Sequence, residues 1–433
     1  MKKVLTFIFV LISILTFTGC GKTSKTLKIA LDAEDQGRYD ELFDYFTAET
    51  GIEVSATYGQ DVSKLIGTKD EPDIIKTSTV SILSMKSSLL DLSDLIKNDN
   101  SMDTTIYIDS IMDALTIDGK IYALPTSINT SLLYYNKTLF DNSAVELRQV
   151  LNLAEGESVY PKANWTWADF QKAGVTLSKY QILDDEVIYS QFGCETQLNW
   201  WGEWMVYVNQ LGGSFYEDGS NNKVSALNSS QAIEAITFFK NKSMGDVTEK
   251  FAPNAIEASG AYSFAAGNVA MILGGHIGDW YSYEALGIDW DIQVLPTPVN
   301  NPNARGGEIS ADAFGISVRS RNVDNAYKFL KMWAGVEGAT KMYQYNKIGA
   351  LKNMEDIIKA LPAEEQKDIN IDALFDAIEL AVTLPREENF EKVCRERVTG
   401  EIYKLFIPGR GGETDVNKVM NNIKTVVDKF YKE

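Results

Sequence analysis

Histidine and cysteine are scarce in this 433-residue chain, which holds one His and three Cys. A zinc site normally takes several His or Cys ligands, so the single His276 argues against a catalytic zinc site. Cys194 and Cys394 follow no metal-ligand spacing such as C-x-x-C. They could form one disulfide or stay as two buried thiols, and the lack of a disulfide framework favours the thiols. The chain also lacks G-x-S-x-G, H-E-x-x-H and P-loop motifs.

Positive charge is in deficit as well. The chain has 41 Lys and Arg against 60 Asp and Glu, a formal net charge of −19. Such a surface is repelled by a phosphate backbone, which argues against nucleic acid as a partner. Anionic lipid headgroups repel it too, so any attachment to a membrane needs an anchor other than charge.

The first residues offer such an anchor. Lys2 and Lys3 precede an apolar stretch over residues 4–17, which is short for a membrane span and typical of a signal peptide. Small residues then lead to Cys20, as in a bacterial lipobox, although Phe17 stands where a lipobox usually has Leu. We therefore predict a signal peptide over residues 1–19, lipidation of Cys20 and a tether over 20–26. A plain signal peptide or an uncleaved anchor with an incidental cysteine are the alternatives.

The pattern of apolar residues after the tether predicts an α/β fold. Residues 27–31 alternate as in a strand, residues 42–46 have helical spacing before Gly51, and residues 52–58 alternate again. Such a β-α-β unit builds a parallel sheet covered by helices. "PDII" at 72–75 and "VAMILGG" at 269–275 read as buried strands. Thr166 with Asp169, and Asn228 with Gln231, are expected to cap two helices.

Two interruptions suggest that the chain has two cores, as its length also indicates. In "GKIYALPTSINTSLLYYNKTLF" (119–140), a polar run over 126–130 separates two apolar stretches. In "DWDIQVLPTP" (289–298), a strand ends in two prolines. We expect the polar run to be an open crossover between two lobes and residues 295–299 to be the return.

Ten segments in order resemble one known family. They are "FTAETGIEVSATYG", "EPDII", "GKIYALPTSINTSLLYYNKTLF", "NWTWADF", "LGGSFYEDGS", "ALNSSQAIEAITFF", "SFAAGNVAMILGG", "VLPTP", "GGEISADAFGIS" and "NAYKFLKMWAGVEG". The chain is similar to the extracellular solute-binding proteins of bacterial ABC importers, in the sugar-binding, maltose-binding-like branch. The resemblance implies a two-lobe periplasmic-binding-protein-like fold with the ligand in a cleft between the lobes. Lobe one is implied at 27–127 plus 298–348, and lobe two at 128–297 plus 349–433, with a third crossing near 348–353.

Candidate ligand-binding residues come first from lobe one and the crossover. Asp35 and Gln36 follow the first strand, and Thr77 follows "PDII"; the family's equivalent positions reach the cleft. Asn129 lies on the crossover, where maltose-binding relatives have an acid, so the same sugar specificity does not carry over. Glu308, in "GGEISADAF", is expected near the cleft with Ser310 and Asp312. A planar polar group of this kind can hold a sugar hydroxyl.

Lobe two is expected to supply aromatic rings, which stack on the apolar faces of sugars. The family's loop after "AM-x-x-x-G" commonly delivers a stacking Trp, so Trp280 is our main candidate, with His276 and Asp279 in the same loop. The start of a helix near "QLNWWGEW" adds Asn199 and one of Trp200 or Trp201. Helical spacing places Trp204 and Trp333 in the core instead.

The resemblance implies a receptor rather than an enzyme, lipid-anchored on the outer face of the cytoplasmic membrane, monomeric and without a cofactor. Its partners would be a carbohydrate, the permease subunits of an ABC transporter, and the membrane through the lipid. Two alternatives stay open. A surface glycoside hydrolase would use paired carboxylates, which are abundant here. The same binding fold could instead hold glycerol phosphate or a peptide, and a phosphate would favour clustered Lys or Arg.

Overall fold

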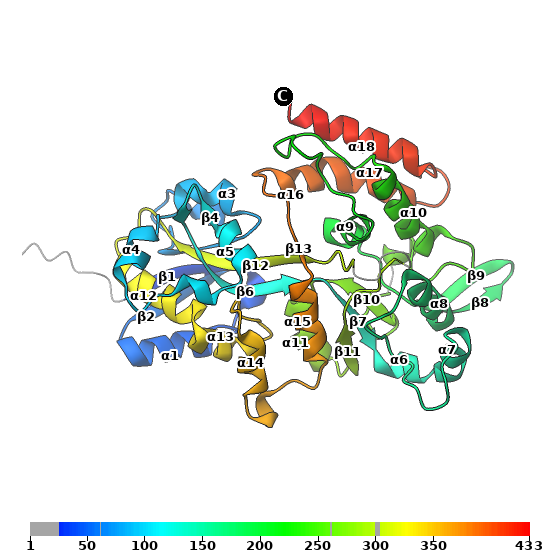
Figure 1. Cartoon of the computed structure of the whole chain (residues 1–433), viewed down its shortest axis with the longest axis horizontal. Helices are drawn as coiled ribbons and strands as arrows, with labels where there is room; N and C mark the ends of the chain where they lie inside the picture. Colours follow the sequence, from blue (N-terminus) through cyan, green and yellow to red (C-terminus); the bar gives the residue numbers. More distant parts are fainter. Residues whose placement is uncertain (1–25, 61, 260–261, 299–303) are drawn as a thin grey trace, which may run out of the picture.

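The structure is a computed structural model that describes residues 26–60, 62–259, 262–298 and 304–433. The predicted signal peptide, Cys20 and the tether through residue 25 lie outside the described residues, as does Val299 of the predicted return. Figure 1 shows two lobes side by side, joined by strands that pass between them. We call the part built on the six-stranded sheet the first lobe, and the part built on the three-stranded sheet the second lobe.

The first lobe is organised by a mixed sheet in the order β13-β12-β3-β1-β2, with β6 also paired to β12. β1 is parallel to β2 and β3, whereas β12 is antiparallel to β3 and β6. The strands are β1 (Thr26–Leu31), β2 (Glu53–Tyr58), β3 (Ile74–Ser78), β6 (Leu124–Thr130), β12 (Glu308–Ile316) and β13 (Val382–Thr383). The predicted β-α-β unit is confirmed, and Gly51 ends its helix with a left-handed φ of 70°.

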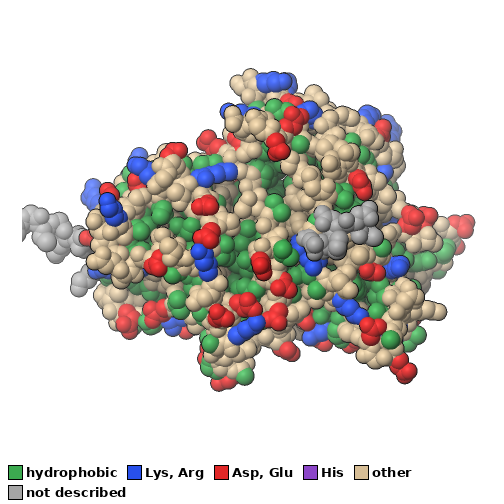
Figure 2. All heavy atoms as spheres, in the orientation of Figure 1, with side chains coloured by type: hydrophobic (Ala, Val, Ile, Leu, Met, Phe, Trp, Pro, Cys, Tyr) green, Lys and Arg blue, Asp and Glu red, His purple; other side chains and the backbone are tan. Residues whose placement is uncertain are grey.

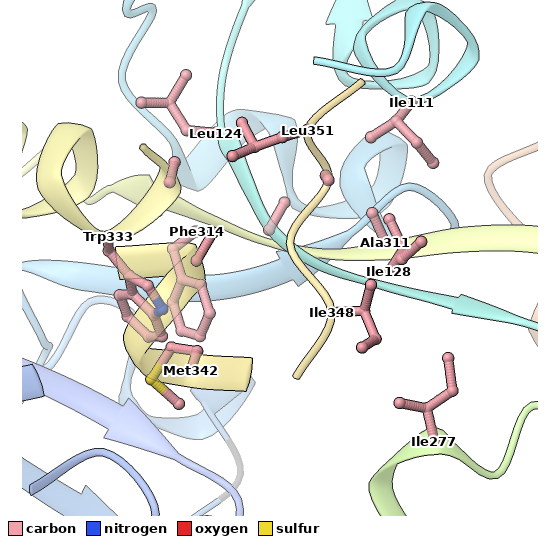
Figure 3. Close-up of a cluster of buried hydrophobic side chains, with 14 of the residues drawn as sticks. Ile111, Leu124, Ile128, Ile277, Ala311, Phe314, Trp333, Met342, Ile348 and Leu351 are labelled. Atoms are coloured by element: carbon pink, nitrogen blue, oxygen red, sulfur yellow. The ribbon is translucent and has the colours of Figure 1, made fainter. Parts of the chain in front are cut away.

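Helices surround this sheet and connect its strands (Figure 1). They are α1 (Asp40–Thr50), α2 (Val62–Leu65), α3 (Ile82–Met85), α4 (Ser93–Asn98), α5 (Asp109–Leu115), α12 (Val323–Ala334) and α13 (Val336–Tyr343). A small hairpin of β4 (Thr116–Ile117) and β5 (Lys120–Ile121) lies beside α5. Trp333 of α12 lies on Phe314 of β12, with 4.2 Å between ring centroids, which confirms the prediction that Trp333 is a core residue (Figure 3).

The second lobe is built on an antiparallel sheet in the order β10-β7-β11. Its strands are β7 (Leu132–Asn136), β10 (Met271–Gly274) and β11 (Trp290–Gln293). Side chains alternate between the faces: Leu133 and Leu273 enter the core of the second lobe, whereas Tyr134 and Ile272 join a core continuous with that of the first lobe. The sheet is therefore buried on both sides, which explains why "VAMILGG" is apolar throughout.

Helices of the second lobe gather on the side of Leu133 and Leu273, together with an exposed hairpin at the far end (Figure 1). They are α6 (Lys137–Asp141), α7 (Ala144–Val150), α8 (Trp167–Leu177), α9 (Trp201–Gln210), α10 (Ser230–Met244), α16 (Phe390–Val393), α17 (Thr399–Tyr403) and α18 (Val416–Phe430); the hairpin is β8 (Lys179–Leu183) with β9 (Glu186–Gln191). Trp204 is buried in this core, as predicted, and Cys194 and Cys394 are buried free thiols.

The capping predictions had mixed outcomes. Thr166 and Asp169 form the predicted capping box at α8. At α10 the N-cap is Ser229, whose side chain accepts from the Ala232 amide, so the prediction of Asn228 was wrong by one residue. Asn228 instead donates to Asn421 of α18 at 3.0 Å.

The polar run over residues 126–130 is not an open crossover, which corrects the sequence interpretation. It belongs to β6, which pairs with β12, and Thr126, Ser127 and Thr130 are buried. Their hydroxyls are satisfied by β12: for example, Thr130 Oγ1 donates to the Glu308 carbonyl at 2.9 Å. Only Ser131 separates β6 in the first sheet from β7 in the second. The chain therefore changes sheets there inside a continuous core rather than through solvent.

A third connection follows the first-lobe helices. Residues at 348 and 351 still bridge to Ile128 and Tyr107 of the first lobe. The chain then forms α14 (Met354–Lys359) and α15 (Ile371–Glu379), which lie low between the lobes in Figure 1 near α11 (Trp280–Ala285). It next returns to the sheet as β13 before entering α16. The lobe boundary at residue 348 stays a prediction.

The surface agrees with the overall charge. Figure 2 shows Asp and Glu side chains over both lobes, with Lys and Arg scattered among them rather than gathered into one patch. Of the helices in the part of the chain that the structure describes, none is long and apolar enough to cross a bilayer.

Candidate functional site

Four strands end at the junction between the lobes. β6 enters the second lobe directly after Thr130, which pairs with Ile309 near the start of β12. β1 and β3 run antiparallel to β12, so their carboxyl ends point toward the second lobe. β10 runs antiparallel to β7, so its carboxyl end at Gly274 points back toward the first lobe. Ser78 at the end of β3 and the loops that carry Asp35 and His276 therefore meet where ligands bind in open α/β sheets.

Charged side chains cluster on the first-lobe side of this junction. Asp35, with 0% exposed surface, lies 3.6 Å from both Lys76 Nζ and Lys347 Nζ. Lys347 Nζ also lies 3.8 Å from Asp312 Oδ2, and Lys76 pairs with Asp32. We call these five residues the charged cluster. Three negative and two positive charges leave it with a net charge of −1.

The opposite charges in this cluster stabilise one another in their ionised forms. Burial lowers the pKa of Lys76, but Asp312, Asp32 and Asp35 outweigh it, and the net effect raises the pKa above its usual value. Burial also raises the pKa of Tyr39, with the Asp35 carboxylate adding to the shift. Neither oxygen of Asp35 accepts a hydrogen bond from the described residues. Asp35 is buried between the two lysines, and the carboxylates of the cluster that reach the surface are those of Asp32 and Asp312, whose side chains are 58% and 21% exposed.

The other first-lobe candidates lie around this cluster with different exposure. Thr77 is buried, and its hydroxyl lies 3.2 Å from Ser81 Oγ, so it contacts a neighbouring loop rather than an open surface. Gln36 is exposed beside Asp35. Asn129 is half-buried on β6 opposite Ser310, and it lies close to Gly275 at the end of β10.

The second-lobe wall is formed by Trp200 and the loop after β10. Trp200 precedes α9 and is half-buried. Its ring lies against Gly202 and Gly274 so closely that a Cβ at either position would fall within 2.6 Å of ring atoms. Gly274 also has φ +142°, so glycine is needed there for both space and backbone conformation. The two glycines thus fix the orientation of an aromatic ring at the junction.

His276 connects this wall to its loop. Its Nε2 lies 2.6 Å from Gln197 Nε2, and its Nδ1 lies 3.1 Å from Asp279 Oδ2. His276 is half-buried, whereas Asp279 and Asn199 are exposed. The structure therefore brings Asn199, Trp200, His276 and Asp279 to the same side of the junction.

A buried ion pair supports the wall from beneath. Lys242 of α10 pairs with Glu203 of α9, and their side chains are 0% and 1% exposed. Glu203 accepts from the Gln197 amide at 2.5 Å, and Lys242 donates to the Glu195 carbonyl at 3.3 Å. The sequence analysis missed both residues. Lys242 occupies the buried face of α10, three residues after Phe239, and a lysine in that apolar stripe was the available signal.

A pocket of about 280 Å³ lies between α9, the loop after α9 and the β13 segment. Trp201 and Glu308 of the predicted set line it, and Asn209, Tyr216, Asp218 and Phe390 were not foreseen. Burial raises the pKa of Glu308 to about 7, with the charge of Glu391 adding to the shift. Glu308 shares β12 with Ser310 and Asp312 at alternate positions, so the strand links this pocket to the charged cluster.

The prediction that Trp280 offers a stacking face is wrong. Its side chain has 0% exposed surface, and its Nε1 donates to Tyr134 Oη at 3.3 Å. Trp290 packs beside it at 5.6 Å between ring centroids. Trp280 begins α11, and that helix turns the ring into the core under β7, away from the junction. The aromatic ring at the junction is that of Trp200.

One direct contact joins the lobes near this loop. Arg38, just before α1, donates from Nη1 to the Gly278 carbonyl at 3.4 Å. Its guanidinium also lies 6.0 Å from the centre of the Tyr281 ring. Among the described residues, no group of three or more His, Cys, Asp or Glu side chains is arranged to hold a metal ion.

The known proteins that this chain resembles are solute-binding proteins. Residues 32–340 match the family described as bacterial extracellular solute-binding protein. The Galactooligosaccharide-binding protein of Bacillus subtilis is 22% identical over 278 residues, which are 63% of this chain and 59% of that relative. The Maltodextrin-binding protein MdxE of the same organism is 24% identical over 349 residues, 75% of this chain and 71% of the relative.

The fold is also that of solved structures. An ABC substrate-binding protein of Listeria monocytogenes, solved in complex with cycloalternan, superposes with a TM-score of 0.76 at 22% identity and covers 94% of this chain and 98% of its own. The two-lobe fold predicted from the sequence is thereby confirmed. The family match extends over more than half of the sequence and includes β3, β6 and β10, which end at the junction. This chain belongs to the bacterial extracellular solute-binding protein family.

Proposed function

We propose that this protein captures a carbohydrate between its two lobes and delivers it to the permease of an ABC transporter. The observation that carries the proposal is the pairing of two surfaces across the junction. On one side Trp200 is fixed over glycines and flanked by His276. On the other side the charged cluster around Asp35 presents the carboxylates of Asp32 and Asp312, whose side chains are 58% and 21% exposed. An aromatic face and planar acceptors are what a sugar ring requires.

The relatives support a carbohydrate as the ligand class. Both Bacillus subtilis relatives are named for the oligosaccharides they bind, and the Listeria monocytogenes protein was solved with one. The charged cluster supports the same class over a phosphate ester. Each of its lysines is already paired with aspartate and the net charge is −1, so it repels a phosphate.

The proposed ligand contacts come from both lobes and from the connection between them. Trp200 and Trp201 supply rings, and His276 and Asp279 supply polar groups from the second lobe. Asn129 and Glu308 lie on the strands that link the sheets, and the first lobe supplies Asp35 and Gln36. The full set also includes Thr77 and Asn199.

The proposal also covers where the protein is held and what happens to its ligand. Cys20 carries the lipid that holds the receptor on the outer face of the membrane, and the protein works as a monomer that releases its ligand unchanged. Cys20→Ala tests the anchor. The variant is expected in the medium or as an unprocessed precursor, and mature-sized variant protein in the membrane fraction would contradict lipidation.

A thermal-shift screen over mono- and oligosaccharides tests the central claim. A ligand present at one hundred times its Kd stabilises the native state by about 2.7 kcal/mol, which is a measurable rise in Tm. The matched control is a panel of glycerol phosphates and short peptides. Stabilisation by the control panel and by no carbohydrate would overturn the proposal, and so would cleavage of the stabilising sugar by the pure protein.

A further inference from the structure

The pocket beside α9 contains a carboxylate that lacks a partner. Glu308 is 7% exposed and lines the pocket, and its Oε2 accepts no hydrogen bond from the described residues. A buried carboxylate of this kind is unfavourable unless it is paired with a cation or protonated. The pocket therefore contains a buried carboxylate oxygen that no described residue of the protein hydrogen-bonds.

The surrounding charges do not compensate Glu308. Among the described residues that line the pocket there is no Lys, Arg or His. The other acids near it are Glu217 and Asp218 of the loop after α9, and Glu391 of α16, whose charge acts on Glu308 directly. Glu217 pairs with Lys424 at 2.7 Å, and the same lysine lies 3.3 Å from Asp428. What remains is an excess of negative charge facing an enclosed space.

Aromatic side chains form one part of the lining. Trp201 lies edge-on to Phe390 with 4.9 Å between ring centroids, and Phe215 lies edge-on to the same ring at 5.1 Å. Tyr216 is part of the same wall. Aromatic faces attract cations as well as the apolar faces of sugars. The volume of about 280 Å³ is close to the lower end of the ~300–1,000 Å³ of small-molecule pockets, which suits one ring of a larger ligand.

We propose that this pocket receives a protonated amine, so that the carbohydrate captured by this protein is an amino sugar. The inference rests on the proposed function and narrows its ligand. An ammonium group donates to Glu308 Oε2 and supplies the positive charge that the pocket lacks. A neutral hydroxyl in the same place donates a hydrogen bond but leaves the charge of Glu308 uncompensated, whereas Glu391 already has Arg395 as a nearby cation. An acetylated amine has neither the charge nor the size of the ammonium group.

Calorimetric titration with three matched probes tests the inference: the β-1,4-linked disaccharides of glucosamine, of N-acetylglucosamine and of glucose. They share ring and linkage and differ at one substituent on each ring. At pH 7.5 the glucosamine disaccharide is expected to bind the wild type at least about tenfold more tightly than the glucose disaccharide, as for a hydrogen bond between charged groups. Equal or weaker binding of the amine-bearing probe would overturn the inference.

Two variants assign the preference to Glu308. Glu308→Gln keeps the shape of the side chain and removes its charge, so it should abolish the preference without lowering the Tm of the unliganded protein. Glu217→Gln, at an acid that is already paired with Lys424, is the control and should keep the preference. If Glu308→Gln discriminates as well as the wild type, Glu308 is not the recognition group and the inference fails.

The pH dependence provides a readout on the unmodified protein. Because Glu308 is protonated at low pH, the amine preference of the wild type should shrink at pH 5.5 and return at pH 7.5. The same shift in Glu308→Gln would assign it to a group other than Glu308 and contradict the inference. Neutral carbohydrates that stabilise the protein, with no gain from the amine, would refute the amino-sugar assignment and leave the proposed function standing.

Discussion

Gln197 and His276 join the two segments of the second-lobe wall, with 2.6 Å between their Nε2 atoms. An amide nitrogen only donates, so His276 Nε2 accepts, and the ring proton is on Nδ1, where it donates to Asp279. The segment before α9 and the loop after β10 are therefore held in one arrangement. Trp200 lies between them and packs on Gly274, so the position of its ring depends on this contact.

Gln197→Ala should weaken carbohydrate binding because it frees His276 and the loop that carries it. Loss of one hydrogen bond of about 0.5–1.5 kcal/mol corresponds to roughly a threefold to tenfold rise in Kd. Calorimetry with the best carbohydrate from the screen measures the effect. Gln366→Ala is the control, since Gln366 is exposed and its side chain donates to the nearby carbonyls of Lys359 and Leu361, away from the second-lobe wall. Equal affinities for wild type and Gln197→Ala would show that the contact does not position the wall.

Trp280→Ala should destabilise the fold. Removing a fully buried tryptophan leaves a cavity, and comparable substitutions cost about 3–5 kcal/mol in the free energy of unfolding. Urea unfolding measures this loss. The matched variant is Trp200→Ala, which removes a half-buried ring at the junction and should mainly reduce ligand affinity. A stable Trp280→Ala variant that no longer binds carbohydrate would show that Trp280 contacts the ligand.

Removing one partner of the Lys242–Glu203 ion pair should destabilise the fold more than removing both charges. Lys242→Met leaves Glu203 buried without its cation, and such losses cost about 3–5 kcal/mol. The double variant Lys242→Met/Glu203→Gln should recover much of that stability because no buried charge remains. Lys418→Met, which breaks the exposed pair with Glu413, should have little effect. A double variant no more stable than Lys242→Met would show that packing, rather than charge, is what the lysine contributes.

The fold could be predicted from the sequence wherever periodicity was local. The alternation in β1 and β2, the spacing in α1 and the capping box at Thr166 all appear in the structure. The polar run in β6 could not be predicted as buried. Its hydroxyls are satisfied by β12, about 180 residues later in the chain, and a single sequence does not show that pairing.

The sequence predicted which loops form the candidate site, but not which side chains of those loops face the junction. Strand ends identified the right loops because carboxyl ends of strands meet at a junction. Which tryptophan of the second lobe faces that junction depends on helix geometry. α11 turns Trp280 inward, while Trp200 precedes α9 and is held over Gly274. Lys347 was missed because its partners are distant in sequence: Asp35 lies in the loop after β1 and Asp312 lies on β12.

Glu308 should make the stability of the unliganded protein depend on pH. Its pKa is raised from the usual 4.5 to about 7, so between these values the folded protein binds a proton that the unfolded chain has lost. The stability contributed by protonated Glu308 is complete below pH 4.5 and is lost as pH rises through 7. The loss is roughly 3 kcal/mol at about 1.4 kcal/mol per pH unit.

Urea unfolding of wild type and Glu308→Gln from pH 4.5 to 8 measures that contribution as a difference, because all other titrating groups are common to both proteins. Gln cannot ionise, so the variant should gain stability relative to the wild type as pH rises, and the gain should level off above pH 7. Glu217→Gln should show no such trend, since Lys424 already neutralises Glu217 in the folded state. A constant difference across the range would mean that Glu308 titrates in the folded protein as it does in the unfolded chain, and that the pocket places no constraint on its charge.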